Sequence, residues 1–196
     1  MDHPDLEPAA RHLGGLVANV TDEALARPTP CRDYTLGDLI EHVGGLSVGL
    51  AAAAEKRTVA GASGPSGDAG RLGDDWRTRI PRDLLGLAGS WRNPDAWSGM
   101  TQAGGIDLPG NICGLVTLDE LVVHGWDVAR ASGQPYACDA ATLTTIRGFL
   151  AGFDTPDVAE GGPFGPPVPV ADDAPLVDQV VGLAGRDPGW SALAAD

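Results

Sequence analysis

The chain has 196 residues, of which 43% are hydrophobic, and a formal net charge of −14 at pH 7. This length favours a single domain, 1–196, whose core is large enough to need no disulfides. The acidic balance argues against nucleic acid or an anionic membrane surface as a partner.

Cysteine usage and the absence of targeting signals predict a cytoplasmic protein. Cys31, Cys113 and Cys138 are an odd number without CxxC spacing, which favours a reduced environment over a disulfide framework. A signal peptide has a basic region followed by an apolar run, and the N-terminus shows no such pattern. No apolar stretch is long enough to cross a bilayer.

Apolar residues at helical spacing predict the first two helices. One covers residues 5–19, and the second opens at Thr35, its predicted N-cap, with Asp38 placed to complete a capping box. The second helix carries an apolar stripe of Leu36, Leu39, Ile40, Val43, Leu46 and Leu50. His42 lies at the spacing of this stripe, so we expect it on the buried face of the helix.

The middle of the chain alternates between loop and helix. Residues 58–75 are rich in Gly, Ala and Ser and indicate a loop. A third helix is expected near 81–92. The stretch 97–110 is interrupted by glycines and receives no assignment.

The second half of the chain predicts three more helices. A long helix covers 111–132, with Asn111 as its candidate N-cap, and further helices cover 139–153 and 174–184. Between the last two, the Gly/Pro-rich residues 161–167 are expected to be extended. No segment shows a strand pattern, so the predicted fold class is all-α.

Glu120 and His124 carry the strongest chemical signal in the sequence. They are four residues apart on the long helix, so their side chains lie on one face, one turn apart. Leu121 and Val128 mark the same side as buried. With His42 from the second helix, the pair offers two imidazoles and a carboxylate, which can hold a divalent metal and leave one coordination position open.

Each of these residues also has a simpler interpretation. A Glu and a His four residues apart are common on helix surfaces, where such a pair contributes about 0.2–0.5 kcal/mol. His42 alone could be a hydrogen-bonded core histidine. Asp127, one turn after His124, either orients its imidazole beside the metal or forms a salt bridge with Arg130.

Three stretches of the chain carry a resemblance to a known family. They are Pro28-Thr29-Pro30-Cys31 through Tyr34-Thr35-Leu36-Gly37-Asp38-Leu39-Ile40-Glu41-His42-Val43, then Glu120-Leu121-Val122-Val123-His124-Gly125-Trp126-Asp127-Val128-Ala129-Arg130-Ala131, and Phe164-Gly165-Pro166-Pro167-Val168 through Gly185-Arg186-Asp187-Pro188. Together they resemble the actinobacterial branch of the DinB-like metal-binding superfamily, which includes the N-terminal domain of mycothiol-dependent maleylpyruvate isomerase. The stretches span nearly the whole chain.

The resemblance implies a DinB-like four-helix bundle, about 4–155, followed by a C-terminal extension, about 156–196, with additional helices and an extended Gly/Pro-rich segment. It also implies a metal site, often zinc or nickel, for which His42, Glu120 and His124 match the ligand positions. Relatives often use a low-molecular-weight thiol such as mycothiol or bacillithiol. Both a monomer and a homodimer are compatible with the superfamily.

The leading hypothesis is therefore a metal-dependent, thiol-dependent transferase or isomerase. Zinc is the first metal expected, with nickel as the alternative, and a bound thiolate would attack a small electrophilic substrate. We expect the chain to depart from maleylpyruvate isomerase in the separate C-terminal domain that helps build that active site, so maleylpyruvate is not the expected substrate. The alternatives are a hydrolase with a metal-activated water and a non-enzymatic metal-binding or ligand-binding module, or a bundle whose metal is only structural and closed by a fourth protein ligand.

Overall fold

A computed structural model describes residues 3–58, 66–152 and 166–192. Within these ranges the chain forms the α-helices α1 (Glu7–Ala18), α2 (Leu36–Ala54), α3 (Trp76–Ser90), α4 (Gly110–Ser132), α5 (Ala140–Leu150) and α7 (Leu176–Leu183). A hairpin of β1 (Met100–Ala103) and β2 (Ile106–Pro109) connects α3 to α4. Short 3-10 turns are η1 (Asp22–Ala24), η2 (Ala69–Arg71) and η3 (Pro94–Trp97). The described fold is mostly helical, as predicted.

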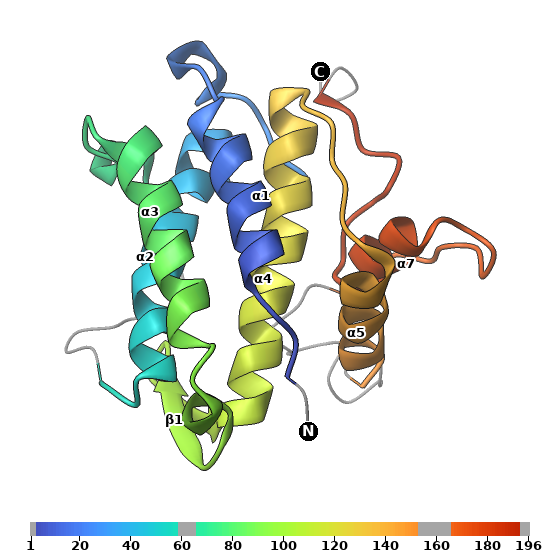
Figure 1. The fold of residues 1–196 in the computed structure, drawn as a ribbon. Coiled ribbons are helices and arrows are strands. Elements are labelled where there is room, and N and C mark those ends of the chain that lie inside the picture. The colour runs from blue at the N-terminus through green and yellow to red at the C-terminus, as the bar shows by residue number, and fades with distance from the viewer. Residues whose placement is uncertain (1–2, 59–65, 153–165, 193–196) are drawn as a thin grey trace.

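Helices α1 to α4 pack side by side around one apolar core (Figure 1). Both α1 and α2 contact α3 and α4. The four helices supply most of the largest fully buried side chains, among them Leu13, Leu36, Leu39, Ile40, Ile80, Leu84, Leu87 and Leu118. Burying one such side chain contributes about 1.5–3 kcal/mol. This core fixes α2 and α4 against each other, and these are the two helices that carry the predicted metal ligands.

Helices α5 and α7 lie beside α4, outside the bundle, and pack mainly against each other (Figure 1). Their bounds agree with the helices predicted at 139–153 and 174–184 to within a few residues. The predicted boundary near residue 155 lies outside the described residues. So does most of the predicted extended segment, of which Pro166 and Pro167 are described and have no regular secondary structure.

The start of α2 confirms the predicted capping box. The Thr35 hydroxyl accepts a hydrogen bond from the backbone N–H of Asp38, and the Asp38 carboxylate accepts one from the backbone N–H of Thr35. Two N–H groups without helical partners are satisfied in this way. The carboxylate also accepts a bond from the N–H of Ala69, which ties η2 to the helix start.

The hairpin corrects the prediction that the chain contains no strands. Its strands pair antiparallel, with Met100 opposite Pro109 and Ala103 opposite Ile106. Gly104 and Gly105 form the turn with φ of +57° and +85°, a geometry that glycine adopts without strain. Strands of four residues are too short to show a clear alternation of apolar and polar residues. The Gly104-Gly105 pair is the feature of the sequence that indicates a hairpin turn here.

Two predicted helix starts are also wrong. Helix α3 begins at Trp76 and includes Pro81, where the prediction placed its first turn. A Cβ on Gly14 of α1 would lie 3.3 Å from Pro81, so the proline ring packs closely on α1 and helps to offset its missing N–H. Helix α4 begins at Gly110 after Pro109, which places Asn111 inside the first turn and not at the cap.

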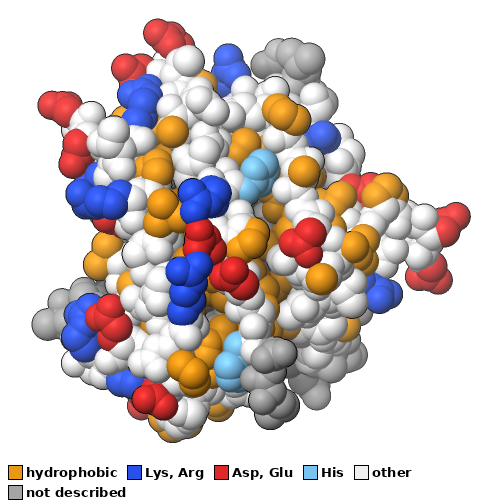
Figure 2. Space-filling model, viewed as in Figure 1, with side chains coloured by type: hydrophobic (Ala, Val, Ile, Leu, Met, Phe, Trp, Pro, Cys, Tyr) orange, Lys and Arg blue, Asp and Glu red, His pale blue; other side chains and the backbone are white. Residues whose placement is uncertain are grey.

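The face formed by α1 and α3 carries acidic and basic side chains close together (Figure 2). Nearby ion pairs include Glu7 of α1 with Arg92, which follows α3, and Arg77 of α3 with Asp22 of η1. Such exposed pairs contribute little to stability, about 0–1 kcal/mol each. None of the described helices combines the length and the hydropathy that crossing a membrane requires.

Candidate metal centre

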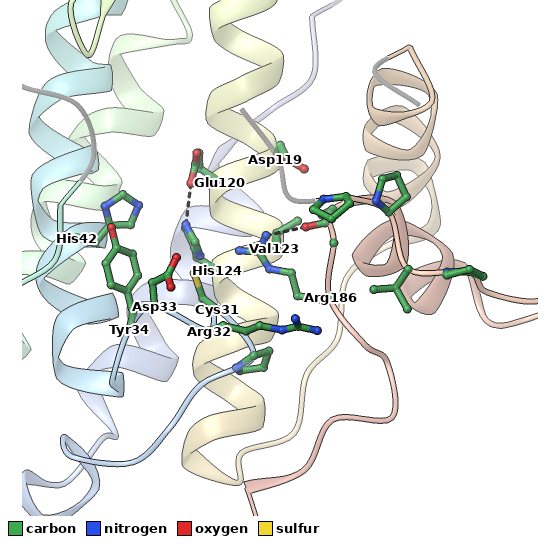
Figure 3. Close-up of a pocket in the computed structure, with 17 residues that line it drawn as sticks. Cys31, Arg32, Asp33, Tyr34, His42, Asp119, Glu120, Val123, His124 and Arg186 are labelled. Atoms are coloured by element: carbon green, nitrogen blue, oxygen red, sulfur yellow. Dashed lines mark hydrogen bonds and ion pairs between the residues drawn. The ribbon is translucent and has the colours of Figure 1, made fainter. Parts of the chain in front are cut away.

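The three predicted ligands meet between α2 and α4. His42 comes from α2, and Glu120 and His124 come from successive turns of α4 (Figure 3). One ligand atom of each residue lies within 4.8 Å of the other two, and the two imidazole rings meet edge to face with centroids 5.1 Å apart. Two imidazole nitrogens and one carboxylate oxygen form a donor set that zinc takes in catalytic sites, so these residues fit a divalent metal.

His124 has a carboxylate at each ring nitrogen. Its Nε2 lies 2.9 Å from Oε2 of Glu120, and its Nδ1 lies 3.0 Å from Oδ2 of Asp127. The sequence allowed Asp127 to contact either His124 or Arg130, and in the structure it contacts His124. Arg130 instead donates to two backbone carbonyls that follow α7. A carboxylate on the second nitrogen fixes the orientation of a ligating imidazole.

Arg186, in the segment after α7, forms an ion pair with Asp127. Asp127 is completely buried, and Nη2 of Arg186 donates to its Oδ2 at 3.0 Å. A second guanidinium nitrogen, Nη1, donates to the carbonyl of Ala184 at 2.7 Å. The sequence did not single out Arg186 for this role. Its contact spans 59 residues, and helical periodicity cannot detect such a pair.

Burial and neighbouring charges move the pKa values of the two histidines apart. Burial, with the charge of His124, lowers the pKa of His42 to about 4. Burial would lower the pKa of His124 too, but Glu120 and Asp127 raise it to about 9. The reciprocal effect of His124 lowers the pKa of Glu120 against its burial, and Arg186 does the same for Asp127. Without a metal, His42 is therefore neutral at pH 7 and His124 is cationic.

A pocket of about 620 Å³ opens onto the three ligands. Its walls come from the loop before α2, from α4 and from the segments on either side of α7 (Figure 3). Two adjacent rows of α4 line it, one with Glu120 and His124 and the other with Asp119 and Val123. The pocket is large enough for a small ligand.

The loop before α2 is fixed by Thr29, whose hydroxyl donates to the carbonyls of Cys31 and Tyr34. The Tyr34 ring lies 5.2 Å from the ring of His42, between centroids. Cys31 also lines the pocket, and burial raises the pKa of its thiol to about 11. This cysteine stays protonated at neutral pH and is a poor nucleophile.

Asp119 is a pocket residue that the sequence analysis missed. Its side chain is 2% exposed, and burial together with the charge of Glu120 raises its pKa to about 8. The predicted stripe assigned one inward face to the long helix. In the structure α4 is buried on all sides from Leu121 to Ala129, because α5, α7 and their flanking segments cover the side turned away from the bundle.

Comparison with known proteins identifies relatives of the chain. A family model described as the mycothiol maleylpyruvate isomerase N-terminal domain matches residues 6–129. Two uncharacterized proteins of Mycobacterium tuberculosis, from strains CDC 1551 / Oshkosh and H37Rv, are each 29% identical over 182 residues, covering 89% of this chain and 91% of theirs. No solved structure matches the chain significantly. The matched residues 6–129 include the three ligands and Asp127 but not Arg186.

Proposed function

The chain belongs to the mycothiol maleylpyruvate isomerase N-terminal domain family, and from this premise we propose a metal-dependent enzyme that uses a low-molecular-weight thiol of the mycothiol kind. It would act as a transferase or isomerase on a small electrophilic substrate, from a bundle of the DinB type. The observation that carries the proposal is the group of His42, Glu120 and His124 beside the pocket. A bound zinc or nickel ion would favour the thiolate form of a coordinated thiol, which is the nucleophilic form.

The chain's own residues prepare the site for binding. His42 is neutral at pH 7 and can donate its lone pair without losing a proton first. Asp127 accepts from Nδ1 of His124 and so directs Nε2 toward Glu120. Arg186 keeps Asp127 ionised and in place. The three ligands therefore require little rearrangement to converge on one ion.

The position of Asp127 favours an open site over a closed structural one. A structural zinc site usually has four protein ligands. Asp127 is a nearby carboxylate, but it contacts the ring nitrogen of His124 opposite to the one facing Glu120. Its carboxylate is also engaged by Arg186. This arrangement supports an exchangeable position that faces the pocket.

The proposed chemistry is attack of sulfur on an electrophilic carbon of the substrate. If the new carbon–sulfur bond persists, the result is conjugation: either the bond to a leaving group breaks and the leaving group takes up the thiol proton, or the thiol adds across a double bond and its proton goes to the neighbouring carbon. If the thiol adds to a double bond, the single bond rotates and the thiol is eliminated, the result is isomerisation and the thiol is regenerated. The pocket volume allows a thiol and a small substrate to be present together. A hydrolase in which water replaces the thiol would use the same residues, and assays with and without mycothiol separate the two.

Metal analysis tests the proposal directly. We expect about one zinc or nickel ion per chain in protein prepared with metal present, and loss of that ion in His124→Ala. His12→Ala is the matched control, because His12 lies on α1 and does not line the pocket. A wild-type chain that binds no metal, or a His124→Ala variant that retains it, contradicts the proposal.

A further inference from the structure

Asp119 is a buried carboxyl group with an unsatisfied oxygen. Its Oδ1 has no hydrogen-bond partner within the described part of the chain, and the residue is 2% exposed. His12 and Trp91 also have an unpartnered buried nitrogen there, but neither residue lines the pocket. Leaving a buried polar group unpaired costs about 1–3 kcal/mol, and more for a charged one. Stability alone therefore gives no reason for an Asp at position 119.

The location of Asp119 gives a functional reason. Asp119 precedes Glu120 in the sequence and also lines the pocket. Val123, one helical turn later on the same side of α4, lies in the same wall. In Figure 3, Glu120 points toward His42, whereas Asp119 lies on the side of α4 that faces the C-terminal segment. A ligand held by the triad therefore has Asp119 on its flank, within the same pocket.

The charged neighbours of Asp119 do not satisfy it. Arg186 is the buried cation of the pocket, but its guanidinium donates to Asp127 and to the carbonyl of Ala184. Arg32 lines the pocket at an exposed position. Within the described residues no partner is left for Oδ1 of Asp119, and a donor group brought in by the ligand can supply one.

We infer that Asp119 selects the thiol by accepting a hydrogen bond from an N–H or O–H group that lies a few bonds from the sulfur. This inference rests on the proposed function, because it requires the sulfur to bind at the triad. A thiol with such a donor satisfies the buried oxygen of Asp119, and an alkyl thiol leaves it unpaired. Sites built to hydrogen-bond a ligand group discriminate strongly against analogues that lack the group.

Three thiols of similar length test the inference on the full chain loaded with Co²⁺. Cysteamine carries an ammonium group, 2-mercaptoethanol a hydroxyl group and 1-propanethiol neither, and thiolate-to-cobalt absorption reports binding of each. For the wild type we expect cysteamine or 2-mercaptoethanol to bind at least about tenfold more tightly than 1-propanethiol, which corresponds to about 1.4 kcal/mol. The tighter of the two identifies the ammonium or the hydroxyl as the preferred donor.

Asp119→Leu should abolish this discrimination while leaving the affinity for 1-propanethiol unchanged, and Asp119→Ala should repeat the result if leucine does not fit. Asp33→Ala is the matched control, because it removes an exposed carboxylate from the same pocket. A second readout is thermal unfolding. Removing an unpaired buried carboxyl should raise the melting temperature of Asp119→Leu by about 2–4 °C, whereas a structural role would lower it.

The outcomes distinguish this inference from the proposed function. If no thiol gives a cobalt absorption band in the wild type, the proposed function fails and the inference fails with it. If all three thiols bind the wild type equally, the proposed function stands and the inference is overturned. Discrimination that survives in Asp119→Leu or Asp119→Ala also overturns it.

Discussion

The two halves of α4 differ in how completely they are buried and in what they bury: Asn111, Ile112, Leu115 and Val116 of the first half keep some exposure, whereas every residue from Leu121 to Ala129 is buried. From Gly110 to Leu118 the buried residues are apolar or small, and a Cβ on Gly114 would lie 2.3 Å from the ring of Trp97. The buried polar side chain in this half, Thr117, satisfies itself by donating to the carbonyl of Cys113. From Asp119 to Ser132 the same helix buries Asp119, His124 and Asp127.

This difference separates stability from chemistry along one helix. The first half needs only shape complementarity with its neighbours. The second half contains charges that are costly to bury unless partners reach them, and one partner, Arg186, comes from a segment beyond the family match. We therefore expect substitutions in the first half to change stability alone and those in the second to change metal binding as well.

The largest effect is expected from Arg186→Met, which removes the guanidinium from the buried Asp127, one of the two cations that contact this carboxylate in the metal-free protein. Removing one partner of a buried ion pair typically costs about 3–5 kcal/mol, so the free energy of unfolding of the metal-free protein should fall by that amount. Chemical denaturation measures it, with Arg147→Met as a control for losing one positive charge at an exposed position of α5. A loss of less than about 1 kcal/mol would mean that the pair behaves like a surface salt bridge.

Gly114→Ala should destabilise the fold by about 3 kcal/mol, the upper end of what overpacking causes, because the new methyl group overlaps the buried indole of Trp97. Metal affinity should not change. The control is Gly15→Ala on α1, where a Cβ meets nothing within 4 Å and should stabilise the helix by about 0.5–1 kcal/mol. Weaker metal binding in Gly114→Ala would show that the two halves of α4 are coupled.

Asp127→Asn should lower metal affinity by about 10–100-fold, the usual effect of losing the residue that orients a ligating imidazole. Isothermal titration of the metal-free protein with Zn²⁺ measures the change. Asp33→Asn, in the same pocket, should leave the affinity unaltered. Equal affinity in Asp127→Asn and wild type would exclude the orienting role.

Metal affinity should rise by about tenfold per pH unit from pH 7 toward 9, because the ion displaces one proton from His124, whose pKa is about 9 without metal. His42 adds nothing to this slope, since its pKa is about 4. The metal-free protein should respond in the opposite sense. Protonated His124 stabilises the folded metal-free protein through its ion pairs. This contribution to the free energy of unfolding is fully present below about pH 6.5 and is lost as the pH rises through 9. Zn²⁺ titrations at several pH values and denaturation at the same values test both signs.

The sequence predicted the helices and the meeting of His42, Glu120 and His124 because the signals for both are local. Spacing placed His42 in an apolar stripe and put Glu120 and His124 on one face, and the capping box at Thr35 fixed the start of α2. The sequence did not decide whether Asp127 pairs with His124 or with Arg130, since both lie one turn away on the same helix. Only the tertiary structure decides between them.

The missed features depend on contacts between distant residues. Asp119 is buried because elements after α4 cover its side of the helix, and Arg186 reaches the site from the far end of the chain. The hairpin has four-residue strands that carry too little alternation to be recognised. Each of these errors arises where tertiary packing overrides the local pattern.

Lys56 is the single lysine of the chain, and its ammonium group donates to the carbonyls of Ala96 and Ser98, joining the end of α2 to η3 and the residue after it. Amine-reactive labels therefore find one side-chain target. Since those bonds must open before the amine can lose its proton and react, the acylation rate of Lys56 gives a single-site kinetic reporter of how often this junction opens.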